Sequence, residues 1–257
     1  MHCFAFDIET VPDAALGRRL YDLEGLADAD VSEVMVMRRR QQAGHEFLPL
    51  LQHRVVAISV ALRTRDQFRL WSLGEKDSSE AELVGRFFDG LDRLSPDLVS
   101  WNGKGFDLPV LHYRAMLHGI QAPRYWETGD GDQGFRWNNY LNRYHWRHLD
   151  LMDVLSGFQA GARVRLDEMA IMLGFPGKLG MHGGQVAEHF ARGDIERIRN
   201  YCETDVLNTF LIYLRFEHMR GRLDTPGLAA EFDVVRAALQ AEDKPHLGAF
   251  LEAWKPA

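Results

Sequence analysis

The sequence predicts an α/β protein in which one mixed sheet is flanked by helices. Three features indicate this: short apolar or alternating runs typical of strands, longer stretches with helical periodicity, and the order in which the two alternate along the chain. Three strands are expected first, then helix, strand, helix, strand, and a helical remainder. We therefore expect a five-stranded sheet in a single domain over residues 1–257, with core motifs at 1–216 and a C-terminal helical extension at 226–257.

Each expected strand is a short run rich in β-branched, aromatic or other apolar residues. The first run, CFAFDIE, is apolar until it becomes acidic at its C-terminal end. The fourth run, LVSW, follows the chain break at Ser95-Pro96-Asp97. The expected strands lie at residues 3–9, 55–62, 68–73, 98–101 and near 148–152.

The expected helices are recognised by their periodicity and by the residues at their ends. A capping box, Ser79-x-x-Glu82, opens the first clear helix. Gly174 and Gly193 each follow a helical stretch and predict C-terminal caps. The expected helices lie within 20–50 and at 79–94, 108–118, 165–173, 184–191 and 194–217, with further helices beginning at Thr225-Pro226 and at Pro245.

Composition excludes several classes of protein. The net charge of −7 argues against a protein that coats nucleic acid by charge alone, although an enzyme can still hold phosphates through bound cations. Two cysteines, Cys3 and Cys202, do not make a disulfide framework, and both are expected to be buried thiols. Without a signal peptide or an apolar run of roughly 20 residues, we expect a cytoplasmic protein that does not enter membranes.

Asp7 and Glu9 are the first candidate site residues. Side chains two apart on a strand point to the same face, and ligand sites in open α/β sheets lie at the carboxyl ends of strands. The alternative interpretation is that both carboxylates cap a turn into Val11-Pro12-Asp13.

Asp107 is the next candidate, in the turn between an expected strand and an expected helix. Aspartate is also a common N-cap, so a structural role fits this position equally well. Asn102 and Gly103 in the same segment are typical of a tight turn, and shaping that turn is an alternative to any functional role.

Asp205 stands out because it lies beside the apolar stripe of the longest expected helix, three residues after Cys202. A carboxylate at the margin of a core is unfavourable unless it is paired or bound to a metal. Tyr201 lies one turn earlier on the same helix face. The alternative is an aspartate in a salt bridge at the edge of the core.

The four carboxylates would repel one another and raise each other's pKa values if they converged without a cation. Two divalent ions would remove this repulsion and support in-line phosphoryl displacement. An all-oxygen ligand set favours Mg²⁺ or Mn²⁺. The phenol of Tyr201 is a weak base near neutral pH, but it can orient an attacking water.

Three segments together resemble the exonuclease motifs of the DEDD superfamily: FDIET (6–10), NGKGFDLPVL (102–111) and YCETD (201–205), in that order. The third has the Tyr-x-x-x-Asp spacing of the tyrosine-type branch. The chain most resembles the predicted 3′-5′ exonucleases related to the proofreading domain of family B DNA polymerases. The resemblance covers residues 1 to about 216, including RLDEMAIMLGFPGK (165–178), and implies a ribonuclease H-like fold.

The resemblance also implies a role for each motif residue. Asp7 would bridge two metal ions, Glu9 and Asp205 would hold the ion on the nucleophile side, and Asp107 would hold the other partly through water. Tyr201 would orient the attacking water. Candidate nucleic-acid-binding positions are Thr10, Asn102, Lys104, Phe106 and Lys178.

The implied substrate is single-stranded DNA or RNA with a free 3′ end. Only about 50 residues follow the third motif, so no attached polymerase is expected. Two segments, 20–50 and 124–147, lie outside the motif pattern and could influence substrate choice. The aromatic and arginine residues of 124–147 fit either a surface that stacks on bases or a satellite core.

Two competing functions remain open. The first is a non-catalytic nucleic-acid-binding module on the same fold, because fold alone does not determine function. The second is a related exoribonuclease or endonuclease. Asp150 and Asp153 could be further metal ligands, but a structural role is the preferred interpretation because the set of four carboxylates is already complete.

Overall fold

The computed structural model describes residues 2–255 and contains a five-stranded sheet with strand order β3-β2-β1-β4-β5. β1 pairs antiparallel with β2 and parallel with β4, so the predicted mixed sheet is confirmed. The strands are β1 (Cys3–Pro12), β2 (His53–Arg63), β3 (Phe68–Ser72), β4 (Asp97–Ser100) and β5 (His148–Asp150).

The central strand β1 has different partners along its two edges. It pairs with β2 as far as Pro12, but with β4 only over Cys3–Ala5. The expectation that β1 ends at Glu9 was therefore wrong, because its ladder with β2 continues beyond the carboxylates. Asp7 and Glu9 instead lie past the end of the β4 ladder, where this edge of β1 is free for other segments to approach. A register shift between Glu9 and Thr10 adds a local twist at the same point.

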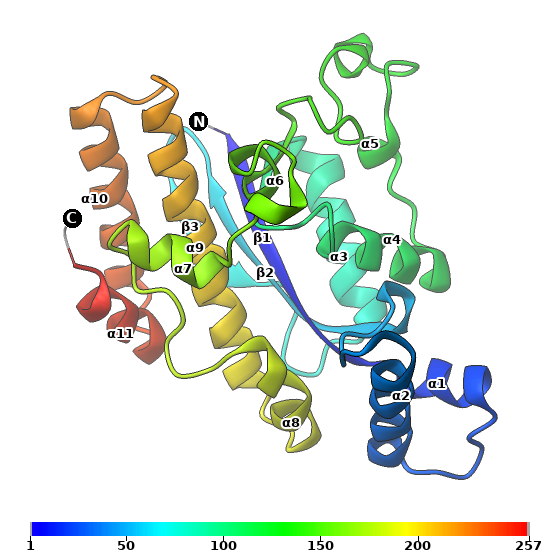
Figure 1. The fold of residues 1–257 in the computed structure, drawn as a ribbon. Coiled ribbons are helices and arrows are strands. Elements are labelled where there is room, and N and C mark those ends of the chain that lie inside the picture. Colours follow the sequence, from blue (N-terminus) through cyan, green and yellow to red (C-terminus); the bar gives the residue numbers. More distant parts are fainter. Residues whose placement is uncertain (1, 256–257) are drawn as a thin grey trace.

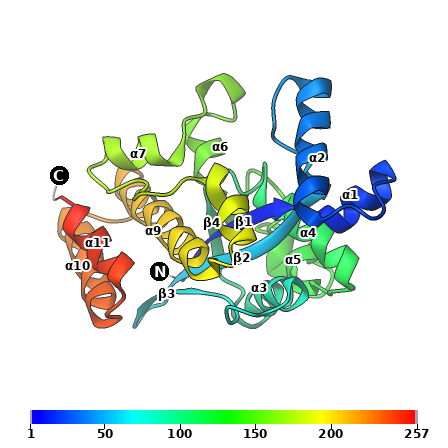
Figure 2. The same cartoon turned by 90° about the horizontal axis from the view of Figure 1, so that it is seen from below.

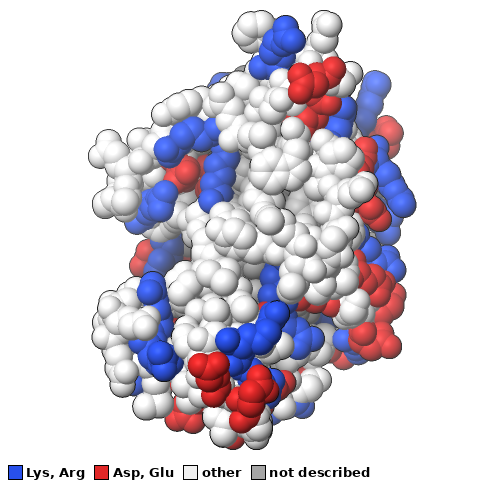
Figure 3. Space-filling view, turned by 90° about the vertical axis from the view of Figure 1, so that its right-hand side faces the viewer, with Lys and Arg blue, Asp and Glu red and all other residues white. Residues whose placement is uncertain are grey.

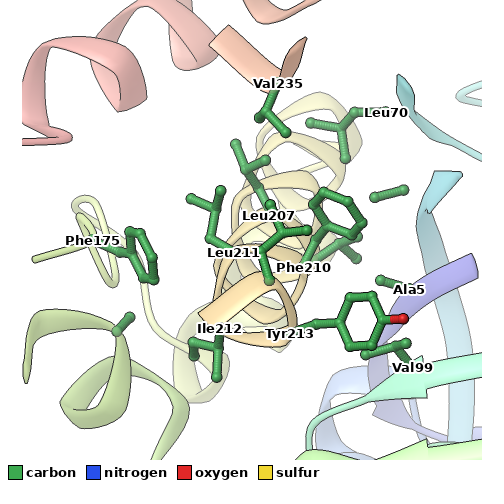
Figure 4. Close-up of a cluster of buried hydrophobic side chains, with 14 of the residues drawn as sticks. Ala5, Leu70, Val99, Phe175, Leu207, Phe210, Leu211, Ile212, Tyr213 and Val235 are labelled. Atoms are coloured by element: carbon green, nitrogen blue, oxygen red, sulfur yellow. The ribbon is translucent and has the colours of Figure 1, made fainter. Parts of the chain in front are cut away.

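One face of the sheet is covered by α9 (Ile195–Met219), the longest helix. Its apolar side chains form one buried cluster with β1, β3 and the two C-terminal helices, α10 (Thr225–Ala241) and α11 (Pro245–Ala253). Figure 4 shows Phe210 and Leu207 of α9 close to Leu70 of β3 and Val235 of α10. The C-terminal helices thus share the core of the sheet.

The opposite face is covered by α3 (Glu80–Leu94) and α4 (Asp107–His118), as the view from below shows (Figure 2). Phe4 and Phe6 of β1 contact Phe87 of α3 at ring-centroid distances of 6.0 and 5.0 Å. The alternation of β1 therefore points its phenylalanines toward α3 and its carboxylates toward α9.

The remaining helices lie around this three-layer core (Figure 1). They are α1 (Ala14–Tyr21), α2 (Asp28–Ala43), α5 (Pro123–Trp126), α6 (Leu151–Leu155), α7 (Leu166–Met172) and α8 (Val186–Ala191). The predicted caps of α7 and α8 are confirmed, because Gly174 and Gly193 have φ of 82° and 75°. Residues 2–255 contain no helix with the length and apolarity that a bilayer crossing requires.

Helix α1 was not expected from the sequence, because it follows β1 after a single residue and is only eight residues long. Asp13 caps it by accepting a hydrogen bond from the Leu16 amide. Gly17 lets α1 approach α2, since a Cβ at this position would lie 2.4 Å from the Met35 sulfur. The insert at 20–50 therefore contains α2, which packs against α1 beside the end of β1.

The aromatic residues of 124–147 divide between two roles. Phe135 and Tyr140 are buried with Tyr125, as a satellite core requires. Trp126, Trp137, Tyr144 and Trp146 are exposed. Both Cys3 and Cys202 are buried free thiols, as predicted.

Candidate active site

Three motif segments meet at the edge of β1 that lies beyond its pairing with β4, which we call the open edge of β1. Asp7 and Glu9 point from β1 toward α9, which carries Asp205, and Asp107 is the first residue of α4. The Ile8 amide donates a 3.2 Å hydrogen bond to Asp107 Oδ1, across 99 residues of chain. The structure thus gathers four carboxylates from three segments that are far apart in the sequence.

Asp107 reaches the site through the turn at 101–106. Asn102 has a left-handed φ of 65°, and its carbonyl accepts hydrogen bonds from the amides of Gly105 and Phe106. The Asp150 carboxylate holds the turn from the other side by accepting the amides of Asn102 and Lys104 at 3.0 and 2.8 Å. Asn102 therefore shapes the turn, and Asp150 anchors it.

The alternative that Asp107 is the N-cap of α4 was wrong. The capping position is occupied by Phe106, which makes no side-chain cap hydrogen bond. The carboxylate of Asp107 is instead turned toward β1, so it is available to the site.

Ionising all four carboxylates at the same time is strongly unfavourable. Glu9, Asp107 and Asp205 are buried, and Asp7 keeps part of its surface exposed. Burial first, and then the neighbouring carboxylates, raise the pKa of Asp7 and Glu9 well above the usual range. Burial raises the pKa of Asp107 to about 7 and that of Asp205 to about 6. A cation is needed if all four are to be ionised at neutral pH.

Lys178 supplies one positive charge to this group and lowers the pKa values of Asp7, Glu9 and Asp205 relative to burial alone. It follows Gly177, whose backbone is held by the buried Asn208 side chain through bonds of 3.2 and 2.9 Å. Asn208 lies on α9 three residues after Asp205 and positions the lysine segment. Sequence reasoning missed it, although a buried polar residue on a core-facing helix was a usable signal.

Tyr201 lies one turn before Asp205 on α9 and is buried. Burial, Asp205 and Glu9 all raise the pKa of its phenol, so the hydroxyl stays protonated at neutral pH. The Lys178 ammonium lies 5.6 Å from the centre of its ring. Tyr201 can therefore donate a hydrogen bond in the site but cannot accept a proton as a base.

The residues present fit hard divalent cations. One oxygen of the Asp205 carboxylate, Oδ1, is buried without a hydrogen-bond partner among the described residues. The four carboxylates carry more negative charge than Lys178 can balance, and all offer oxygen ligands. The Cys202 thiol lies 3.8 Å from Asp7 Oδ2, but burial raises its pKa, so it remains a neutral thiol close to the ligands.

Aromatic side chains form a group beside Asp107. Phe106, next to Asp107, contacts Phe47 and His53 at ring-centroid distances of 5.6 and 5.1 Å. His53 is held by Thr10 Oγ1, 2.8 Å from its Nδ1. Phe47 comes from the insert at 20–50 and is 55% exposed. The sequence offered no pattern that would have brought Phe47 to the motifs.

Of the five nucleic-acid-binding candidates, Thr10 and Phe106 lie in this aromatic group and Lys178 lies among the carboxylates. Asn102 forms the turn. Lys104 lies in another group of charges, made by Asp150, Asp153 and Arg143. Asp153 forms ion pairs with Arg143 and Arg163.

The match to a known family covers Asp107, Tyr201 and Asp205 but begins after Asp7 and Glu9. A family described as "Predicted 3'-5' exonuclease related to the exonuclease domain of PolB" matches residues 45–254. The chain is 24% identical over 147 residues to the catalytic subunit of DNA polymerase epsilon from Dictyostelium discoideum, and 22% identical over 150 residues to that from Saccharomyces cerevisiae. Each match covers 55% of this chain and 6% of the relative, so the chain corresponds to a small part of either.

Proposed function

Because this chain belongs to the family of predicted 3′-5′ exonucleases related to the exonuclease domain of PolB, we propose that it removes nucleotides successively from the 3′ end of single-stranded nucleic acid. The observation that carries this proposal is the convergence of four carboxylates from β1, α4 and α9 at the open edge of β1. Enzymes of this kind generally use divalent metal ions.

Asp7, Glu9, Asp107 and Asp205 would hold two ions, Mg²⁺ or Mn²⁺, as their oxygen ligands suit. When bound, such ions lower the pKa of a coordinated water and stabilise the charge of a phosphoryl transition state. Asp7 is suited to a bridging position because it is close enough to interact with Asp107, Glu9 and Asp205 and keeps part of its surface accessible.

Tyr201 and Lys178 would act on the reacting groups directly. The protonated phenol of Tyr201 would donate a hydrogen bond that orients the attacking water. Lys178, near both Glu9 and Asp205, would attract the substrate phosphate and offset the remaining negative charge. Neither residue needs to change its protonation state for these roles.

The group formed by Phe47, His53 and Phe106 supports a nucleotide substrate. An exposed aromatic face beside Asp107 is suited to stacking on the terminal base, and stacking tolerates all four bases. Thr10 lies next to Glu9 and its hydroxyl is fixed by His53, so it can contact the sugar of the same nucleotide.

The proposal is tested with single-stranded DNA and RNA oligonucleotides labelled at the 5′ end. In Mg²⁺ or Mn²⁺, the expected product is a ladder that shortens from the 3′ end and is absent in chelator. A circular single strand should remain intact, whereas an endonuclease would open it. Binding of both substrates with no cleavage in either metal would favour a non-catalytic nucleic-acid-binding module.

Replacing Tyr201 by phenylalanine should slow turnover by about 10- to 100-fold, the effect of losing a hydrogen bond worth about 1.5–3 kcal/mol beside charged groups. Metal affinity should be unchanged, because the carboxylates remain. Single-turnover rates and metal titrations check this, with Tyr213→Phe on the same helix as the matched control. An unchanged rate in Tyr201→Phe would remove the phenol from the mechanism.

A further inference from the structure

A buried carboxylate outside the candidate active site holds two arginines at the protein surface. The side chain of Asp153 is 8% exposed, and its oxygens lie 2.6 Å from Arg163 and 3.7 Å from Arg143. The arginine side chains themselves are 36% and 46% exposed. Each guanidinium has more donors than Asp153 can accept, so N–H groups remain free to meet an anion.

Aromatic rings lie directly beside these arginines. Tyr144 is 71% exposed and meets Phe158 edge to face at 5.3 Å. The Arg143 guanidinium lies 4.5 Å from the Phe158 ring centre and 5.8 Å from that of Tyr144. We refer to Arg143, Tyr144, Phe158 and Arg163 as the arginine–aromatic cluster.

Phe158 adopts a backbone conformation that a bulky side chain disfavours. Its φ is 61°, directly after Gly157 at 59°, and its amide donates a 2.8 Å hydrogen bond to the Asp153 carbonyl. A non-glycine residue in this region is strained and is usually kept where the surroundings determine it. Here the strained conformation holds the Phe158 ring against Tyr144 at the protein surface. A contact at the surface stabilises the fold only slightly, so folding alone does not explain why the strain is kept.

The cluster is physically continuous with the turn that delivers Asp107. Asp150 accepts the amides of Asn102 and Lys104 and also that of Asp153, at 3.4 Å. Lys104 adds a further positive charge close to Asp150 and Arg143. On the face of the molecule that Figure 3 presents, basic side chains, with a few acidic ones among them, lie above and below a notch in the left-hand outline.

The competing explanation is that these residues only close the loop after α6. Phe135 and Tyr140, from the same segment as Tyr144, do serve a core and are fully buried. Tyr144 differs, because most of its surface is left in water while its ring is still oriented by Phe158 and Arg143. Exposed rings interleaved with cations are how proteins hold single strands without reading their sequence.

We propose that the arginine–aromatic cluster is a second binding site for single-stranded nucleic acid, which holds the strand beyond the nucleotides in the active site. The position of the strand relative to the active site rests on the proposed exonuclease function. The ability of the cluster to bind a single strand does not. Tyr144 and Phe158 would stack on bases, while Arg143 and Arg163 would contact phosphates. The site would make affinity depend on substrate length.

The test compares a long substrate with one too short to reach the cluster. Binding of single-stranded DNA and RNA of about 12 nucleotides is measured by fluorescence anisotropy in an Asp7→Asn background, in which cleavage is expected to be too slow to affect the measurement. Turnover of a dinucleotide is measured with Asp7 intact. Tyr144→Ala and Arg143→Ala are compared with Tyr113→Ala and Arg65→Ala, which replace exposed residues outside the cluster.

Tyr144→Ala should raise the Kd for the long strand about 5- to 20-fold and leave dinucleotide turnover unchanged. Arg143→Ala should also reduce the salt dependence of binding by about 0.7 in the slope of log K against log[salt]. Unchanged Kd values in both variants, with the dinucleotide still cleaved, would overturn the cluster but not the exonuclease. Weakened binding without any cleavage would support the cluster and contradict the proposed function.

Phe158→Gly separates binding from loop closure. Glycine relieves the left-handed strain, so the Tm should not fall, whereas the long-strand Kd should rise as it does in Tyr144→Ala. A lower Tm with an unchanged Kd would mean that the cluster only closes the loop, and the inference would be wrong.

Discussion

Replacing Asp7 by asparagine is expected to reduce turnover by at least about 10³-fold without unfolding the protein. Asp7 interacts with Asp107, Glu9 and Asp205, and its loss removes the carboxylate best placed to be shared between two cations. Metal ions contribute several kcal/mol to the stabilisation of a phosphoryl transition state, and each 1.4 kcal/mol corresponds to about a factor of ten in rate. The measurement is the rate of removal of the 3′ nucleotide at saturating metal.

The same substitution should stabilise the metal-free protein. The pKa of Asp7 is raised in the folded state, so folding is disfavoured when this carboxylate ionises, and stability is lost as the pH rises above the unfolded value near 4. Asparagine does not ionise, so its advantage should be absent near pH 4 and should grow toward pH 8. We expect the gain to be largest at pH 8 in chelator, as measured by denaturant unfolding across this pH range.

The matched control is Asp89→Asn, which replaces an exposed aspartate on α3. It should change neither the turnover of the protein nor the dependence of its stability on pH. Addition of Mg²⁺ or Mn²⁺ should raise the Tm of the wild type more than that of Asp7→Asn, because ligand binding stabilises the folded state. Retained turnover in Asp7→Asn would mean that the metal site has been assigned to the wrong carboxylates.

The sheet and the four carboxylates were predictable because they depend on local patterns and on motif order. CFAFDIE is apolar on both faces before it becomes acidic, which predicts a central strand leading to a site. The capping serine of α3 and the glycines after α7 and α8 act within a few residues, so their signals survive in the sequence alone.

What could not be predicted depends on contacts between distant segments. Nothing near Glu9 indicates that β1 continues to Pro12, because that extension is decided by pairing with β2. Phe47 meets Phe106 across 59 residues of chain, and Asn208 holds Gly177 across 31. Such contacts follow from how the helices dock, and short-range periodicity contains no information about docking.

Replacing Arg114 by methionine is expected to destabilise the protein by about 3–5 kcal/mol, the largest effect we expect from a residue outside the site. Arg114 on α4 pairs with Asp13, 2.5 Å away, and with Glu80 of α3, and all three side chains are at most 6% exposed. Glu80 also accepts the Val55 amide at 2.6 Å and lies 2.9 Å from His118. Methionine fills similar volume but leaves two buried carboxylates without their cation.

Denaturant unfolding measures this loss, and Arg86→Met provides the control. Arg86 pairs with Glu82 on the exposed face of α3, with side chains 54% and 39% exposed, so its loss should cost less than about 1 kcal/mol. Adding Glu80→Gln to Arg114→Met should recover part of the stability, because one unpaired charge is then removed. A loss below about 1 kcal/mol for Arg114→Met would show that the buried pairs are not needed for folding.

The position of the ion pairs between Arg114, Asp13 and Glu80 gives Arg114→Met a second consequence. Asp13 directly precedes α1 and follows Glu9 by four residues, whereas Arg114 belongs to the helix that begins with Asp107. The ion pairs therefore hold β1 and α4, which carry three of the four carboxylates, in one relative position. In the folded fraction of Arg114→Met, metal affinity should fall more than in Arg86→Met. If the two variants bind metal equally well, the contact between Ile8 and Asp107 is sufficient to align the site by itself.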